Sequence, residues 1–140
     1  MKITEATIAA ALADPDVFGD VLADVLNNRG HRDAAIVLTS RTGNWEALKE
    51  AAVIGAMHAA VFGQHSVHGP LTVLATAIWV APDGRDPSVL LAAVPSSDPA
   101  WRMASLVQRL QANGVPAQEW TERMAGITVA ECLAFQPVKA

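Results

Sequence analysis

Three Asp-Pro dipeptides divide this chain, at residues 14–15, 86–87 and 98–99, and apolar residues at helical spacing follow each of them. An aspartate can cap a helix by accepting hydrogen bonds from its free backbone amides. A proline in the first turn then gives up only a hydrogen bond that it would not make. After the first dipeptide, apolar residues recur at three- and four-residue steps, at positions 18, 21, 22, 25 and 26. The pattern predicts a helix after each dipeptide and favours an all-α fold.

Other helix signals fill the segments between these dipeptides. We expect further helices at about 5–13, 32–40 and 45–62, from 70 to the turn at 81–84, at 116–124, and a short one after the capping residue Thr128. Residues 32–40 include a β-branched run typical of a strand, but no comparable second strand is evident to pair with it. Asn27, Asn28 and Gly30 are interpreted as the end of the second helix.

These signals predict seven to eight short helices, packed as helical hairpins in an array or irregular bundle. Ala51, Gly55 and Ala59 recur at four-residue spacing, which predicts a flat groove where a second helix packs closely. We expect one domain over residues 1–136, with Pro137 ending the ordered chain and a disordered tail at 137–140.

Composition excludes several classes of protein. Hydrophobic residues make up 51% of the chain and charged residues 17%, which is typical of a globular protein. The formal net charge is −4 and no basic run occurs, so we expect no nucleic-acid partner. Residues 51–82 contain no charged side chain, but the polar segment at 63–70 divides them into pieces shorter than the ~20 residues of a membrane span. The lone Cys132 and the acidic residues that follow Lys2 favour a cytoplasmic protein.

A series of short motifs in the second half resembles a known helical family. They are Trp79, Asp83-Gly84, the alanine-rich Val89–Ala93, Asp98-Pro99-Ala100-Trp101, Leu106–Leu110, Gly114-Val115-Pro116 and Trp120. The family is the domain-of-unknown-function 4192 family of high-GC actinobacteria and their phages, and this chain resembles its C-terminal half. It departs from the pattern in lacking the usual N-terminal half and in the early break at Pro95. The family carries no established activity, so the resemblance implies a helical fold but no function.

Two groups of residues are candidates for chemistry. His58, His65 and His68 could supply imidazoles to a metal, but neither HExxH nor CxxC accompanies them. A polar loop with two solvent-facing histidines and one helix histidine is the simpler interpretation. Cys132 could act as a nucleophile if its pKa were lowered, but its apolar neighbours Leu133 and Phe135 favour a buried structural cysteine. We therefore assign no catalytic residue, no metal and no cofactor.

The tryptophans are the candidates for an interface. Trp45, Trp101 and Trp120 each lie in or near the first turn of an expected helix, and helix starts often lie at the edge of a domain. A tryptophan at an edge can anchor a partner, although it is more often a lid over the core.

Three hypotheses for function follow. The favoured one is a non-enzymatic, helical protein–protein interaction module that binds another protein or forms a homodimer, with a phage protein that binds a host protein as one version of it. The alternative is a small metal-dependent or thiol enzyme that uses the His58, His65 and His68 region or Cys132. The third, a membrane-associating hairpin built from residues 51–82, is the least favoured.

Overall fold

A computed structural model describes residues 2–135, and within that range the chain forms helices and turns but no β-strand. In chain order the helices are α1 (Glu5–Ala13), α2 (Gly19–Val25), α3 (Arg29–Thr42), α4 (Trp45–Phe62), α5 (His68–Val80), α6 (Pro87–Ala92), α7 (Trp101–Ala112), α8 (Ala117–Ala125) and α9 (Val129–Leu133). The predicted all-α fold of paired helices is confirmed. The described residues form nine helices where seven to eight were expected, and two of these, α6 and α9, are shorter than seven residues.

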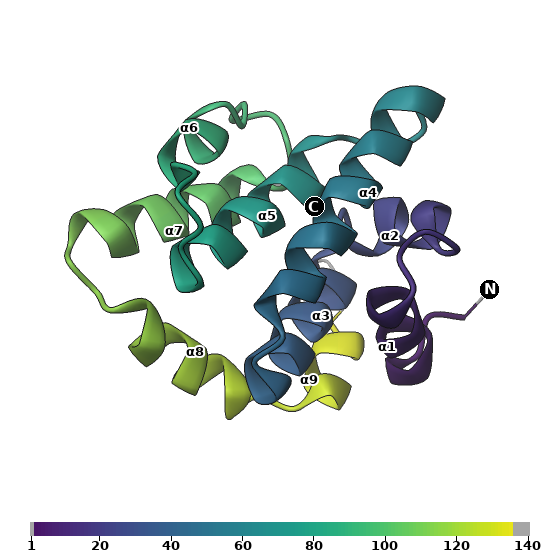
Figure 1. Cartoon of the computed structure of the whole chain (residues 1–140), viewed down its shortest axis with the longest axis horizontal. Helices are drawn as coiled ribbons and strands as arrows, with labels where there is room; N and C mark the ends of the chain where they lie inside the picture. Colours follow the sequence, from purple (N-terminus) through teal and green to yellow (C-terminus); the bar gives the residue numbers. More distant parts are fainter. Residues whose placement is uncertain (1, 136–140) are drawn as a thin grey trace.

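Helices α4 and α5 form the central hairpin of the molecule. Figure 1 shows them near the centre, with α1 and α2 on the α4 side and with α6, α7 and α8 on the α5 side. Nine of the thirteen residues of α5 are buried. At Gly55 of α4, an added Cβ atom would lie 3.4 Å from the backbone of Leu22, so α2 packs closely against the predicted small-residue groove. The spacing of alanine and glycine in α4 therefore serves helix packing in the core.

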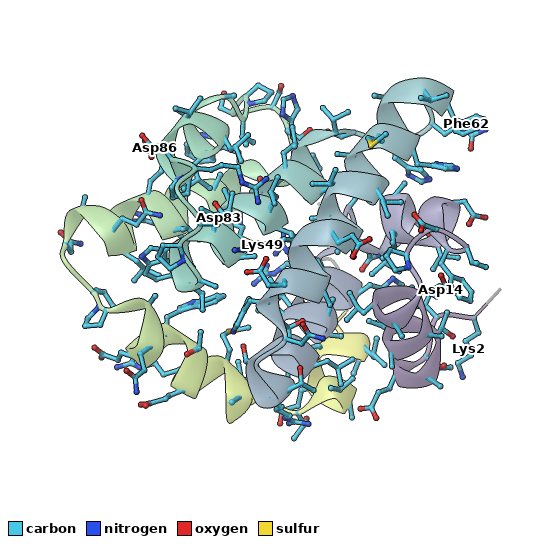
Figure 2. The ribbon with its side chains drawn as sticks, in the orientation of Figure 1. Lys2, Asp14, Lys49, Phe62, Asp83 and Asp86 are labelled. Carbon is cyan, nitrogen blue, oxygen red and sulfur yellow. The ribbon has the colours of Figure 1, made fainter. Side chains whose placement is uncertain are left out.

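The first Asp-Pro dipeptide does not begin a helix. Asp14 is the C-cap residue of α1, and its backbone N–H donates to the Ala10 carbonyl oxygen at 3.0 Å. Pro15 lies in the turn that follows, and α2 begins only at Gly19, after Phe18. The prediction of a cap at Asp14 was wrong because a proline after an aspartate suits a tight turn as well as a first helical turn. Figure 2 shows Asp14 near the end of α1.

Helix α3 begins earlier than predicted. The ambiguous segment 32–40 is helical, as expected, but the helix runs from Arg29 to Thr42. Asn28 does not end α2; its side-chain oxygen caps α3 by accepting from the His31 N–H at 3.2 Å. Gly30 lies inside α3, at a point where α9 comes so close that a Cβ atom would collide with the Cys132 carbonyl oxygen. A glycine read as a stop signal is therefore a point of contact between helices.

The other two Asp-Pro dipeptides behave differently from each other. Asp86 caps α6 by accepting from the Ser88 N–H at 2.9 Å, as predicted, although α6 ends at Ala92. The Asp98 carboxylate accepts from the Ala100 N–H at 2.9 Å and from the Ser66 hydroxyl at 2.6 Å. Regular helix then begins at Trp101, so Pro99 lies in the turn before α7. Asp98 thereby ties the start of α7 to the loop before α5.

No helix in the range 2–135 is long and apolar enough to cross a membrane. The predicted end of order at Pro137 and the tail at 137–140 lie outside the described residues.

Candidate functional site

A cavity of about 420 Å³ opens between α3, α7, α8 and α9, and we call it the α3–α8 groove. Its apolar lining is formed by Ile36, Pro99, Met103, Leu106, Val107, Trp120, Met124, Ile127, Cys132 and Phe135. Its charged lining is formed by Arg29, Arg32, Asp33, Arg102 and Glu131. A mainly apolar surface of this volume with a few polar groups is typical of a binding site.

The amphipathic pattern of α7 builds one wall of this groove. Met103 and Val107 are buried and face the core, whereas Leu106 between them is 43% exposed at the rim. The spacing of these three residues predicts that they share one apolar face of a helix, but the period of a helix does not show where that face meets solvent.

Helix α8 forms the opposite wall and is incompletely covered. None of its nine residues is buried, although its apolar side chains Trp120 and Met124 lie four residues apart on one face. The Trp120 ring packs against Trp79 of α5, with ring centroids 5.7 Å apart. Arg41 of α3 holds the end of α8 by donating from its guanidinium to the carbonyl oxygens of Ala125 and Ile127. Helix α8 is therefore anchored at two places and leaves part of its apolar face open to the groove.

The charged groups of the groove divide into paired and unpaired ones. Arg32 is only 9% exposed, and its guanidinium donates twice to the Asp33 carboxylate, at 3.1 and 3.2 Å. The Arg29 guanidinium lies 4.5 Å from the ring centroid of Phe135, a cation–π contact. Arg102 is exposed at the rim. Over residues 2–135, neither Arg29 nor Arg102 makes a salt bridge.

Cys132 is one of the residues that line the groove, and it is buried. Burial raises the pKa of its thiol, and the negative charges of Asp33 and Glu131 raise that pKa further. The thiol therefore keeps its proton at neutral pH, which is the opposite of what a nucleophile needs. No histidine lines the groove to act as its base.

The three candidate histidines do not form a metal-ligand group. No set of three or more His, Cys, Asp or Glu residues with suitable geometry occurs within the described part of the chain. His58 lies on α4, where its ring packs against that of Phe62, with ring centroids 4.4 Å apart. His65 lies in the loop before α5, and His68 is the first residue of α5 and donates its backbone N–H to the Ser66 hydroxyl at 3.0 Å. Both of these residues are half-buried, so they do not extend freely into solvent.

The three candidate tryptophans occupy different environments. Trp45, the first residue of α4, is only 8% exposed and belongs to the core. Trp101, the first residue of α7, is 43% exposed but does not line the groove. Trp120 lines the groove and is half-buried. The arginines of the groove were not among the predicted site residues, because nothing in the sequence relates Arg29 to Arg102 across 73 positions.

A second hollow, of about 220 Å³, lies between α1, α3 and α4. Its lining contains no charged side chain, and its polar side chains are Thr39, Thr42 and Asn44.

No protein-family model matches this chain, and no curated protein or solved structure matches it either. The resemblance to the domain-of-unknown-function 4192 family therefore stays a prediction.

Proposed function

We propose that this protein is a non-enzymatic helical module that binds a partner protein in the α3–α8 groove. The observation that carries the proposal is the incomplete burial of α8: an amphipathic helix with no buried residue faces a groove with a mainly apolar lining. Apolar area that remains in water on a folded chain favours association with another apolar surface.

The composition of the groove supports a protein partner. Two methionines, Met103 and Met124, line it from opposite walls, and flexible thioether side chains adapt to the shape of an incoming side chain. Trp120 adds a large aromatic surface, and tryptophan and arginine are the residues that most often dominate binding energy at interfaces.

The alternative enzymatic function has less support from the same residues. The raised pKa of Cys132 disfavours a thiol nucleophile, and the candidate histidines are not gathered at the groove. Metal analysis of the purified protein tests the enzymatic alternative separately from partner binding.

The experiment is affinity capture from an actinobacterial lysate, with the wild type and two variants as baits. Quantitative mass spectrometry measures which proteins each bait enriches. Leu106→Asp places a charge at the rim of the groove, whereas Val89→Asp places the same charge on α6, at a site that is 67% exposed and outside the groove. We expect a protein that is enriched by the wild type to be lost with Leu106→Asp and retained with Val89→Asp.

Equal enrichment by both variants would mean that the groove is not the binding surface. If the only protein that the wild type captures is a second copy of this chain, the module is a homodimer, and Leu106→Asp should then make it monomeric in light scattering.

A further inference from the structure

The α3–α8 groove has an excess of positive charge in an acidic protein. Three arginines and two carboxylates line it, whereas the whole chain has a formal net charge of −4. Because Arg32 already binds Asp33, the charged groups that remain are Glu131 and the two arginines that can meet an anionic ligand, Arg29 and Arg102. Both are exposed, and each is fixed to a rigid helix, Arg29 at the first position of α3 and Arg102 at the second position of α7.

Contact with an aromatic ring prepares Arg29 to bind a carboxylate. Its guanidinium lies over Phe135, which itself is 39% exposed at the rim. A guanidinium that stacks on a ring keeps the edges of its plane free to donate hydrogen bonds, and two such bonds match the two oxygens of a carboxylate.

The extent of the groove along α3 matches two turns of a helix. The lining residues of α3 extend from Arg29 to Ile36, which corresponds to about 10 Å along a helix axis, or two turns. The walls are themselves helices, and no strand edge exists in residues 2–135 to which an extended peptide could add. Apolar side chains at three- and four-residue steps of a partner helix would lie between Leu106 and Trp120.

We propose that the occupant of the groove is an amphipathic helix of a partner protein, with leucine-type anchors on its apolar face and carboxylates on the edges that meet Arg29 and Arg102. This proposal rests on the proposed function and adds the chemistry of the partner to it. A basic or neutral amphipathic helix would leave the two arginines unpaired and binds less tightly.

The test uses two synthetic helical peptides of about 15 residues, a length that gives about four turns. Both have leucines at positions i, i+3, i+7 and i+10. One carries glutamates at the flanking positions and the other carries lysines there. Binding to the full chain is measured by fluorescence anisotropy. We expect the acidic peptide to bind about tenfold more tightly, with a difference that shrinks as salt rises.

Reversing the charge of Arg29 and Arg102 tests whether these two residues cause the preference for the acidic peptide. The double variant Arg29→Glu with Arg102→Glu should bind the lysine peptide more tightly than the glutamate peptide. Both changes put a negative charge in the first turn of a helix, where the helix dipole favours it, so the variant should fold. Arg109→Glu is the matched control, because it changes an exposed arginine of the same helix α7 that does not line the groove, and it should keep the acidic preference.

Cys132 supplies a second readout inside the groove. It is the only cysteine of the chain, and a bound peptide should slow its alkylation several-fold.

Four results would overturn the proposal: equal binding of the two peptides, no binding of either, retention of the acidic preference in the double variant, or binding without protection of Cys132. Equal binding that Leu106→Asp abolishes would overturn the acidic partner but leave the groove as an apolar binding site. Failure of the proposed function itself would instead appear as partner capture that Leu106→Asp does not change.

Discussion

The ammonium group of Lys49 on α4 lies 3.2 Å from the carboxylate of Asp83, in the turn between α5 and α6. Figure 2 shows the two labelled residues close together, near α4 and the turn that follows α5. Lys49 is only 3% exposed, and its ammonium group also donates to the Glu46 carboxylate at 2.8 Å and to the Ala81 carbonyl oxygen. Asp83 also accepts from the Arg85 guanidinium. The ammonium group of the buried lysine therefore contacts three oxygen-bearing partners and links α4 to the end of α5.

Replacement of Lys49 by methionine tests whether these contacts stabilise the fold. The methionine keeps the apolar stem but leaves the Ala81 carbonyl oxygen without its donor, and we expect a loss of about 1–2 kcal/mol in the free energy of unfolding. Glu46→Gln is the control, because the Glu46 side chain is 76% exposed, and it should change stability by less than about 0.5 kcal/mol. Urea denaturation followed by circular dichroism measures both. If the free energy of unfolding of Lys49→Met equals that of the wild type, the contacts of Lys49 do not stabilise the fold.

The Asp83 carboxylate should make stability depend on pH in the acid range. Hydrogen bonds from Arg85, and then from Lys49, hold the pKa of Asp83 well below its usual range. A lowered pKa in the folded state means that the ionised carboxylate stabilises the fold at neutral pH. That contribution is complete above about pH 4, the pKa of an unfolded aspartate, and is lost as the pH falls below it.

Thermal unfolding of the wild type and of Asp83→Asn between pH 7 and pH 3 measures this contribution. We expect the variant to be less stable by a constant amount from pH 7 to about pH 4.5, and the difference to shrink below that. A difference that grows as the pH falls would have the wrong sign and would exclude this role for Asp83.

Gly30 should not tolerate a side chain. A Cβ atom there would collide with the carbonyl oxygen of Cys132, which belongs to the backbone of α9 and has little freedom to move. We expect Gly30→Ala to destabilise the protein by about 1–3 kcal/mol, the usual range for overpacking. Gly126→Ala is the control, since its Cβ atom would meet nothing closer than 3.4 Å, and it should be nearly neutral. If both variants unfold at the same urea concentration, α9 does not pack against α3 as described.

Cys132 should react slowly with thiol reagents. Burial and the nearby carboxylates raise the pKa of its thiol, so little thiolate is present at neutral pH. We expect the pH midpoint of alkylation by iodoacetamide to be higher in the native protein than in the urea-unfolded chain. A midpoint that is lower in the native protein would instead identify an activated thiol and revive the enzymatic alternative.

Much of the fold could be predicted because helix signals are local. Thr4 caps α1, Asp86 caps α6 and Thr128 caps α9, each through a hydrogen bond to a backbone N–H two or three residues later. Gly63 and Gly114 adopt left-handed backbone conformations just after helices, as expected for residues that end them. Asp14 and Gly30 were misread because a turn proline and a contact glycine carry the same local signal as a cap and a stop.

The sequence by itself determined that this protein is all-α and where most of its helices begin and end, since capping and amphipathic spacing act over three or four residues. Tertiary structure decided which apolar faces are buried and which stay open. Met103 and Leu106 belong to one apolar pattern on α7, yet Met103 is 8% and Leu106 43% exposed. Arg29 and Arg102 line one groove only because α3 and α7 pack around it. The candidate site depends on these long-range contacts, for which the chain carries no local signal.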